Sequence, residues 1–249
     1  MPEGLNKNRV DQTLVELKLV QSRQRAVALV ISGKVFLNEI KVLKPSKIVS
    51  ANSIIKIKKK DHEWVSRGGI KLNWAIKKFK VNVKKKICVD IGCSSGGFSE
   101  VLLTNGAETI YSVDVGYGQF DWKLRNSEKI ILLEKTNARF LDQKLIPQRL
   151  DLVVCDVSFI SLRKVLEPIK LLLKKSFELI ILIKPQFEIE KKMVGKGGIV
   201  KDPLVHKKVC DESKDWISNQ FHTSFLKIID SPIYGQKGNK EFLLYAKKN

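Results

Sequence analysis

Four charged residues stand at the ends of apolar or helical runs, where an unpaired charge is costly. Asp156 and Lys184 each follow directly after an apolar run. Lys71 opens a helical pattern behind a double glycine, and Glu241 precedes the last apolar run. Any one of them alone is more often a solvated charge at a domain rim. Two lysines and two carboxylates at one sheet edge, however, favour acid–base chemistry and predict a reaction site.

A glycine-rich segment follows the apolar run at 87–91. It reads Gly92-Cys93-Ser94-Ser95-Gly96-Gly97, and a helical pattern begins at Phe98. Glycines allow a tight turn and a close backbone approach to a ligand, and the helix N-terminus adds a positive dipole. The spacing is G-x-x-x-G-G and not the dinucleotide G-x-G-x-x-G. The acid before it, Asp90, disfavours a pyrophosphate and suits the ammonium group of an amino-acid cofactor.

The segment 90–99 resembles the S-adenosylmethionine loop of class I methyltransferases. Asp114 ends the next apolar run, about twenty residues on, where an acid that binds the cofactor ribose is expected. The resemblance implies S-adenosylmethionine as the cofactor. The residues predicted to hold it are Asp90, Gly92, Ser94, Gly96, Gly97, Phe98, Asp114, Asn137, Ala138 and Asp156.

Apolar and helical patterns alternate from about residue 64 onward. Near-continuous apolar runs occupy 87–91, 110–113, 130–133, 152–155 and 179–183, and helical patterns occupy 70–79, 98–105, 162–173 and a segment after Pro203. Buried strands separated by helices indicate a parallel sheet covered on both faces. With a last strand pair near 225–229 and 242–246, the pattern predicts a doubly wound, Rossmann-like α/β domain over residues 67–249.

The first sixty residues predict a separate small α+β domain. Val10, Leu14 and Leu17 recur at helical spacing, and a second helix begins after Ser22 and stops at Gly33. Short strands are predicted at 35–37 and 54–57. The charged stretch at 58–63 is typical of a linker, which we place at residues 61–66.

Longer motifs carry a more specific resemblance. The set Lys71, Asp156, Lys184 and Glu241 resembles the Lys-Asp-Lys-Glu tetrad of FtsJ-like ribose 2′-O-methyltransferases. Segments 65–72, 195–200 and 238–242 resemble the TlyA family, and the resemblance spans nearly the whole chain. Members join an S4 RNA-binding domain to an FtsJ-like methyltransferase, modify ribosomal RNA and are often labelled haemolysins.

The resemblance implies an activity and a mechanism. The expected reaction is 2′-O-methylation of a cytidine in large-subunit (23S) rRNA, with small-subunit (16S) rRNA also modified by longer members. A ribose hydroxyl must lose its proton as it attacks the methyl sulfonium, and Lys184 would accept that proton. A lysine serves as a base only where burial or a like charge such as Lys71 disfavours its charged form. Asp156 and Glu241 would position the lysines and oppose that effect.

The turn after the run 179–183 argues against other methyl acceptors. It reads Lys184-Pro185-Gln186-Phe187, whereas amino-methyltransferases place an Asn or Asp-Pro-Pro-aromatic turn there. A base C5-methyltransferase needs a cysteine nucleophile. Cys155 is near, but it lies within an apolar strand, which favours a buried core role.

The small domain is predicted to grip RNA by its backbone. Its residues resemble the S4 pattern, and its second helix and following turn would place cations along phosphates. Alone, a basic helix face is more often simply solvated, but a neighbouring ribose methyltransferase favours RNA binding. The predicted RNA-binding residues are Arg9, Ser22, Arg23, Arg25, Lys34 and Arg67.

Composition limits the class of partner. Lys and Arg number 46 against 26 Asp and Glu, a net charge of +20, and such an excess suits a polyanion such as ribosomal RNA or a ribosomal subunit. Cys88 and Cys93 lack a second cysteine pair, so we expect no metal site. The absence of a signal sequence or long apolar run predicts a cytoplasmic protein without membrane contact. Two alternatives stay open, a membrane-active haemolysin and a non-catalytic ribosome-assembly factor, as does the oligomeric state.

Overall fold

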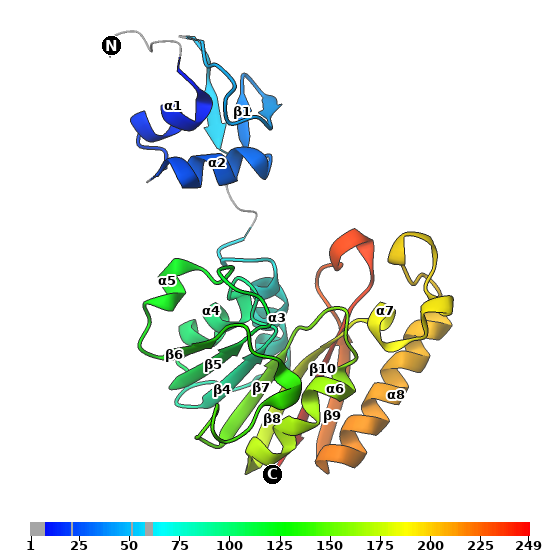
Figure 1. The fold of residues 1–249 in the computed structure, drawn as a ribbon. Helices are drawn as coiled ribbons and strands as arrows, with labels where there is room; N and C mark the ends of the chain where they lie inside the picture. Colours follow the sequence, from blue (N-terminus) through cyan, green and yellow to red (C-terminus); the bar gives the residue numbers. More distant parts are fainter. Residues whose placement is uncertain (1–7, 21, 51, 58–61) are drawn as a thin grey trace. The chain divides into compact units, whose positions relative to one another are not determined.

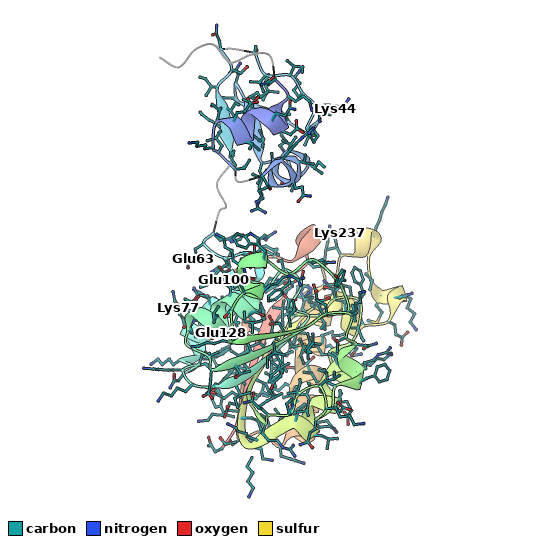
Figure 2. All side chains as sticks on the ribbon, turned by 60° about the vertical axis from the view of Figure 1, so that its left-hand side comes forward. Lys44, Glu63, Lys77, Glu100, Glu128 and Lys237 are labelled. Atoms are coloured by element: carbon teal, nitrogen blue, oxygen red, sulfur yellow. The ribbon has the colours of Figure 1, made fainter. Side chains whose placement is uncertain are left out.

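The computed structural model describes residues 8–20, 22–50, 52–57 and 62–249. The chain folds into two compact units, Met1–Glu63 and Trp64–Asn249 (Figure 1). The larger unit begins ahead of residue 67 because Trp64 is buried in its core and Val65 packs beside it. The Val65 amide also donates to the Glu100 carboxylate of the larger unit at 2.5 Å (Figure 2). The lysines at 58–60 and the first residue of the predicted linker, 61, lie outside the described residues.

The small unit packs two helices on a three-stranded antiparallel sheet. Val10, Leu14, Ala26 and Val30 are fully buried between them. The strand order is β2-β1-β3. The elements are α1 (Val10–Glu16), α2 (Arg23–Ile31), β1 (Val35–Leu37), β2 (Ile40–Val42) and β3 (Ile55–Ile57).

Two local features of this unit differ from expectation. Strand β2 was not predicted; it forms because Asn38 and Glu39, both at positive φ, reverse the chain in a two-residue hairpin turn. Leu17 lies beyond the end of α1 and is exposed. The predicted cap of the second helix is confirmed, since the Ser22 hydroxyl accepts from the Arg25 amide at 3.2 Å.

A buried carboxylate joins α1 to α2. The Asp11 side chain is fully buried and accepts from Arg9 Nε at 3.0 Å and Arg23 Nε at 2.9 Å. Burial raises the pKa of this carboxyl, but the hydrogen bonds and charges of the two arginines outweigh burial and leave the pKa below its usual value. The ion pairs therefore stabilise the fold above the ordinary Asp pKa, and this stability is lost as pH falls through the lower folded pKa. Arg9 and Arg23 thus have a structural role.

The large unit is a seven-stranded sheet with the order β6-β5-β4-β7-β8-β10-β9. Strands β4 to β8 are parallel, and β10 runs antiparallel to both β8 and β9. The strands are β4 (Ile87–Ile91), β5 (Thr109–Val113), β6 (Ile130–Leu133), β7 (Leu150–Cys155), β8 (Leu173–Ile183), β9 (Phe225–Asp230) and β10 (Phe242–Lys248).

Helices cover both faces of this sheet, as the continuous apolar strands predict. Figure 1 shows α3 and α4 on one face and α6 and α8 on the other, and a separate apolar core fills each side. The helices are α3 (Gly68–Phe79), α4 (Gly97–Thr104), α5 (Trp122–Arg125), α6 (Leu162–Leu166), α7 (Pro185–Glu188) and α8 (Pro203–Phe221). Among the described residues, no helix is both long and apolar enough to cross a membrane.

The predicted helix at 162–173 is wrong in its second half. Helix α6 ends at Leu166, and a 3-10 helix spans Pro168–Leu172. Pro168 has no N–H to donate to the preceding turn, so the α-helix cannot continue through it. Strand β8 then begins at Leu173, earlier than predicted, and is 11 residues long.

We expect Asp11→Asn to destabilise the small unit by about 1.5–3 kcal/mol, the range for hydrogen bonds to a charged group. Hydrogen exchange of the α1 and α2 amides at pH 7 in the full chain measures this. Glu16→Gln is the matched control, because Glu16 contacts Asn8 only at the surface. Equal protection in wild type and Asp11→Asn would show that these ion pairs add no stability.

Candidate active site

The sheet brings the four charged residues to one edge. Asp156 follows β7 and Lys184 follows β8, so both lie at the carboxyl ends of neighbouring parallel strands. Strand β10 is antiparallel and pairs Phe242 with Ile183, which places the residue before it, Glu241, beside Lys184. Lys71, in the first turn of α3, reaches the same edge.

These residues form a continuous chain of ion pairs. Lys71 Nζ lies 2.6 Å from Glu241 Oε2 and 3.7 Å from Asp156 Oδ2, and Lys184 Nζ lies 2.5 Å from Asp156 Oδ1. Lys184 also donates to the Ser158 hydroxyl at 2.9 Å. The Asp156 side chain is 18% exposed and the other three are 10% or less. Charges this deeply buried are tolerated only when they are paired, so each member depends on its neighbours.

The ion chain lies in the wall of a cavity of about 550 Å³. One part of this wall is the glycine-rich loop with the start of α4, including Gly92, Ser94 and Phe98. The other part comes from the segments after β7 and β8 and from the β9–β10 loop, including Phe159, Gln186 and Tyr234. The four charged residues therefore face one space with two distinct walls.

The glycine-rich loop packs too closely against neighbouring segments for side chains at two positions. Gly92 has φ 82°, and a Cβ there would lie 2.5 Å from the Asp156 carbonyl oxygen. Gly96 has φ 91°, and a Cβ there would lie 2.5 Å from the Leu124 side chain. Both positions need glycine, and the loop leaves its backbone open toward the cavity.

Asp114 braces this loop from the end of β5. One carboxylate oxygen accepts from the Ser94 amide at 2.8 Å and the other from the Gly116 amide at 2.7 Å. Asp114 is not part of the cavity wall, and neither are Asn137 and Ala138. Asn137 caps its own turn by accepting from the Arg139 amide, and Ala138 is buried. Their proposed contacts with a cofactor remain predictions.

Asp90 lies behind the loop, and its contact with the ammonium group of a cofactor stays a prediction. Its carboxyl is fully buried and accepts from the Ser99 hydroxyl at 2.6 Å, and Ser99 in turn contacts Ser112 at 2.7 Å. Burial raises the pKa of Asp90 to about 7; the Ser99 hydrogen bond opposes this rise, and the charges of Asp156 and Asp114 add to it. As it stands, Asp90 ties β4 to α4 and does not face the cavity.

The predicted RNA-binding residues lie in both units. Arg67 belongs to the cavity wall and donates to the Tyr234 carbonyl at 3.0 Å. In the small unit, Arg25 is exposed and Lys34 is half-buried, while Arg9 and Arg23 hold Asp11. RNA contact by these residues therefore stays a prediction.

Sequence reasoning missed several members of the cavity wall. They are Ser158, Phe159, Gln186, Tyr234 and Asn239. Two segments gave a signal: the turn after β8, whose Gln186 stands two residues beyond the predicted base, and the motif at 238–242, which contains Asn239. Cys155 is fully buried, and burial raises the pKa of its thiol far above the usual value, which fits the core role that the sequence favours.

Comparison with known proteins decides the family. The family model described as "FtsJ-like methyltransferase" matches residues 64–248, and the model described as "S4 domain" matches residues 8–55. The protein named "16S/23S rRNA (cytidine-2'-O)-methyltransferase TlyA" from Mycobacterium tuberculosis is 40% identical over 241 residues, which are 96% of this chain and 89% of that protein. This chain belongs to the TlyA family of FtsJ-like methyltransferases.

Two further matches agree with this TlyA assignment. "Putative rRNA methyltransferase YqxC" from Bacillus subtilis is 41% identical over 242 residues, 96% of this chain and 85% of that protein. The solved structure named "Putative hemolysin from Streptococcus thermophilus" is 34% identical with a TM-score of 0.74, and the match covers 98% of this chain and 89% of that one. These matches confirm the predicted family and the predicted fold. In that fold a class I methyltransferase domain follows a small S4 domain along the sequence.

The raised pKa of Asp90 predicts a pH-dependent stability. An unfolded Asp titrates near 3.8 and Asp90 titrates at about 7 in the folded chain, so the folded state holds an extra proton between these values. Stability therefore falls as pH rises through this window, by about 4 kcal/mol in total. We expect Asp90→Asn to remove this part of the pH slope, because the amide does not titrate.

The measurement is the free energy of unfolding of the large unit by denaturant at pH 4 and pH 8, without added cofactor. Asp121→Asn is the matched control, since Asp121 only caps the short helix α5. A pH slope that is the same in Asp90→Asn and wild type would contradict the assignment.

Proposed function

We propose that this protein transfers a methyl group from S-adenosylmethionine to the ribose 2′-hydroxyl of a cytidine in ribosomal RNA, with 23S rRNA as the principal substrate. The observation that carries the proposal is the buried ion chain that ends in Lys184, set in one cavity with the glycine-rich loop. An intact proton acceptor beside a cofactor loop favours an enzyme over a non-catalytic assembly factor. We place the reaction in the cytoplasm.

The glycine-rich loop fits S-adenosylmethionine. Gly92 and Gly97 line the cavity without side chains, and the start of α4, with its positive dipole, belongs to the same wall. The Ser94 backbone is fixed by Asp114, which keeps the loop shape without a bound ligand. When bound, the cofactor supplies an electrophilic methyl group on a sulfonium, and the other steps fall to the protein's own side chains.

Lys184 is placed to take the proton from the attacking hydroxyl. Its Nζ is oriented by Asp156 and Ser158 and is still in the cavity wall. A sulfonium next to it would favour the uncharged amine, as any like charge does. Lys71 is held by Glu241 and shares Asp156, so it fixes the carboxylate that orients Lys184. Alignment of the hydroxyl with the methyl group supplies much of the acceleration.

RNA contact is supported by charge on both units. The net charge of +20 suits a phosphate backbone. In the large unit, Lys237 lies on the loop between β9 and β10 and lines the cavity (Figure 2). In the small unit, Arg25 and Lys44 are exposed on the S4 domain. We propose that the S4 domain supplies affinity for RNA and that the cavity supplies the chemistry.

The direct test is the product. The purified protein is incubated with S-adenosylmethionine and with rRNA lacking 2′-O-methyl groups, and modified positions are mapped by their resistance to alkaline cleavage. We expect one protected site 3′ to a cytidine in 23S rRNA. Methyl groups found only on bases, or no transfer to either rRNA, would overturn the proposal.

Lys184 variants test the proton acceptor. We expect Lys184→Ala to bind S-adenosylmethionine normally and to lower the single-turnover rate by about 10²–10⁴-fold, the usual contribution of a general base. Lys184→Arg should fail as badly, since arginine keeps its proton at any usable pH. Lys77→Arg, on the surface of α3, is the matched control (Figure 2). A near-normal rate in Lys184→Arg would make this residue an electrostatic clamp and not a base.

A further inference from the structure

Two carboxamide side chains line the cavity, and their surroundings are opposite. Asn239 is buried and uses both ends of its amide: its Oδ1 accepts from the Val200 amide at 3.0 Å, and its Nδ2 donates to the Gly198 carbonyl at 2.8 Å. These bonds join the segment before α8 to the β9–β10 loop. Asn239 therefore uses one acceptor site and one donor of its amide on the protein itself.

Gln186 has the opposite character. Its side chain lines the same cavity, and its Oε1 is shielded from solvent, yet within the described parts of the chain this oxygen has no hydrogen-bond partner. A buried carbonyl without a donor is unfavourable, and such atoms in folded proteins need an explanation. The terminal torsion of a glutamine is soft, so this oxygen can turn toward a ligand at little cost.

The backbone that carries Gln186 is held firmly. The Phe187 amide donates to the Lys184 carbonyl at 2.9 Å. On the other side, Glu188 accepts from the Ser161 hydroxyl at 2.7 Å and from the Leu162 amide at 2.9 Å. These bonds fix α7 between the end of β8 and the start of α6. Gln186 thus has a defined position two residues after Lys184, on the part of the cavity wall formed by the segments after the strands.

The chemistry of the oxygen limits its partner to a hydrogen-bond donor. On a nucleotide whose 2′-hydroxyl is engaged by Lys184, the phosphate and ring oxygens only accept. The remaining donors are the amino and imino groups of the base. A carboxamide is a side chain that can meet a base edge in two adjacent hydrogen bonds.

We propose that Gln186 binds the Watson–Crick edge of the target base, with Oε1 accepting from the exocyclic amino group and Nε2 donating to the neighbouring ring nitrogen. This inference rests on the proposed function and adds a specificity residue to it. Cytosine presents this donor and acceptor side by side, whereas uracil presents the reverse order. The Gln186 contact would therefore require a base that has left its helical stack.

The test pairs a protein variant with a change in the base. The single-turnover rate constant at subsaturating enzyme is measured for wild type and Gln186→Leu on a synthetic rRNA fragment containing the mapped cytidine, and on the same fragment with that base lacking its 4-amino group. We expect loss of the amino group to slow wild type by about 10- to 100-fold, in the range of a lost base contact. Gln186→Leu should be slowed on the normal RNA and lose no further rate on the altered RNA, because the two changes remove the same bond.

Two results would overturn the inference. One is an equal loss in wild type and Gln186→Leu when the amino group is removed. The other is a weaker affinity of Gln186→Leu for S-adenosylmethionine by calorimetry, which would assign the oxygen to the cofactor. Gln220→Leu, at an exposed position on α8, is the matched control. If Gln186→Leu does not fold, Gln186→Met serves with the same expectations.

The same experiment separates this inference from the proposed function. Methylation of the normal fragment by wild type reports on the function alone. If wild type leaves the cytidine unmethylated, the proposed function fails. If wild type methylates it and the coupling between Gln186 and the amino group is absent, only the role of Gln186 fails.

Discussion

The ammonium of Lys71 lies between two carboxylates, Glu241 at 2.6 Å and Asp156 at 3.7 Å, in a region almost closed to water. Removing one partner from such a buried set leaves an uncompensated charge and is strongly unfavourable. These ion pairs therefore fix α3 and the ends of β7 and β10 relative to one another, at the sheet edge that carries Lys184. Because β10 is antiparallel, its beginning meets the ends of β7 and β8, and an acid before β10 can join lysines and acids from the other elements.

The same edge is shaped by positions where side chains are excluded. Gly92 lets the glycine-rich loop contact the Asp156 backbone. Gly235 leaves room for the Glu241 carboxylate, because a Cβ at this position would lie 2.0 Å from Glu241 Oε1. Behind the loop, the buried pair of Asp90 and Ser99 ties β4 to α4. Most of the site is thus braced by contacts within the protein itself.

The sequence predicts those parts of the fold that have a local signal. Continuous apolar runs mark the strands, and a glycine-rich segment between strand and helix marks the loop that lines the cavity. The hairpin strand β2 lacked such a signal, because it is only three residues long and its alternation of Ile40, Lys41 and Val42 is too short to indicate a strand. Pro168 indicates that the helix ends there. The apolar periodicity around it nevertheless led to the prediction of a longer helix.

Contacts between distant segments could not be predicted. The full burial of Asp90 depends on how α4 packs on β4 and β5, which no local pattern specifies. The Asn239 amide bonds to Val200 and Gly198, which lie about forty residues away in the chain. The sequence therefore could not show that Asn239 has hydrogen-bond partners within the protein at both ends of its amide. The four charged residues were found because each stands at an element end, a feature that is visible in the sequence.

A double-variant measurement shows whether the four charged residues act as one unit. Single-turnover methyl transfer to rRNA is measured at saturating S-adenosylmethionine for Lys71→Met, Glu241→Gln and the combination, with thermal unfolding to verify the fold. If the pair works as one unit, the combined variant is no slower than the slower single variant. Losses that multiply in the combined variant would contradict the account, because they would show that Lys71 and Glu241 act independently.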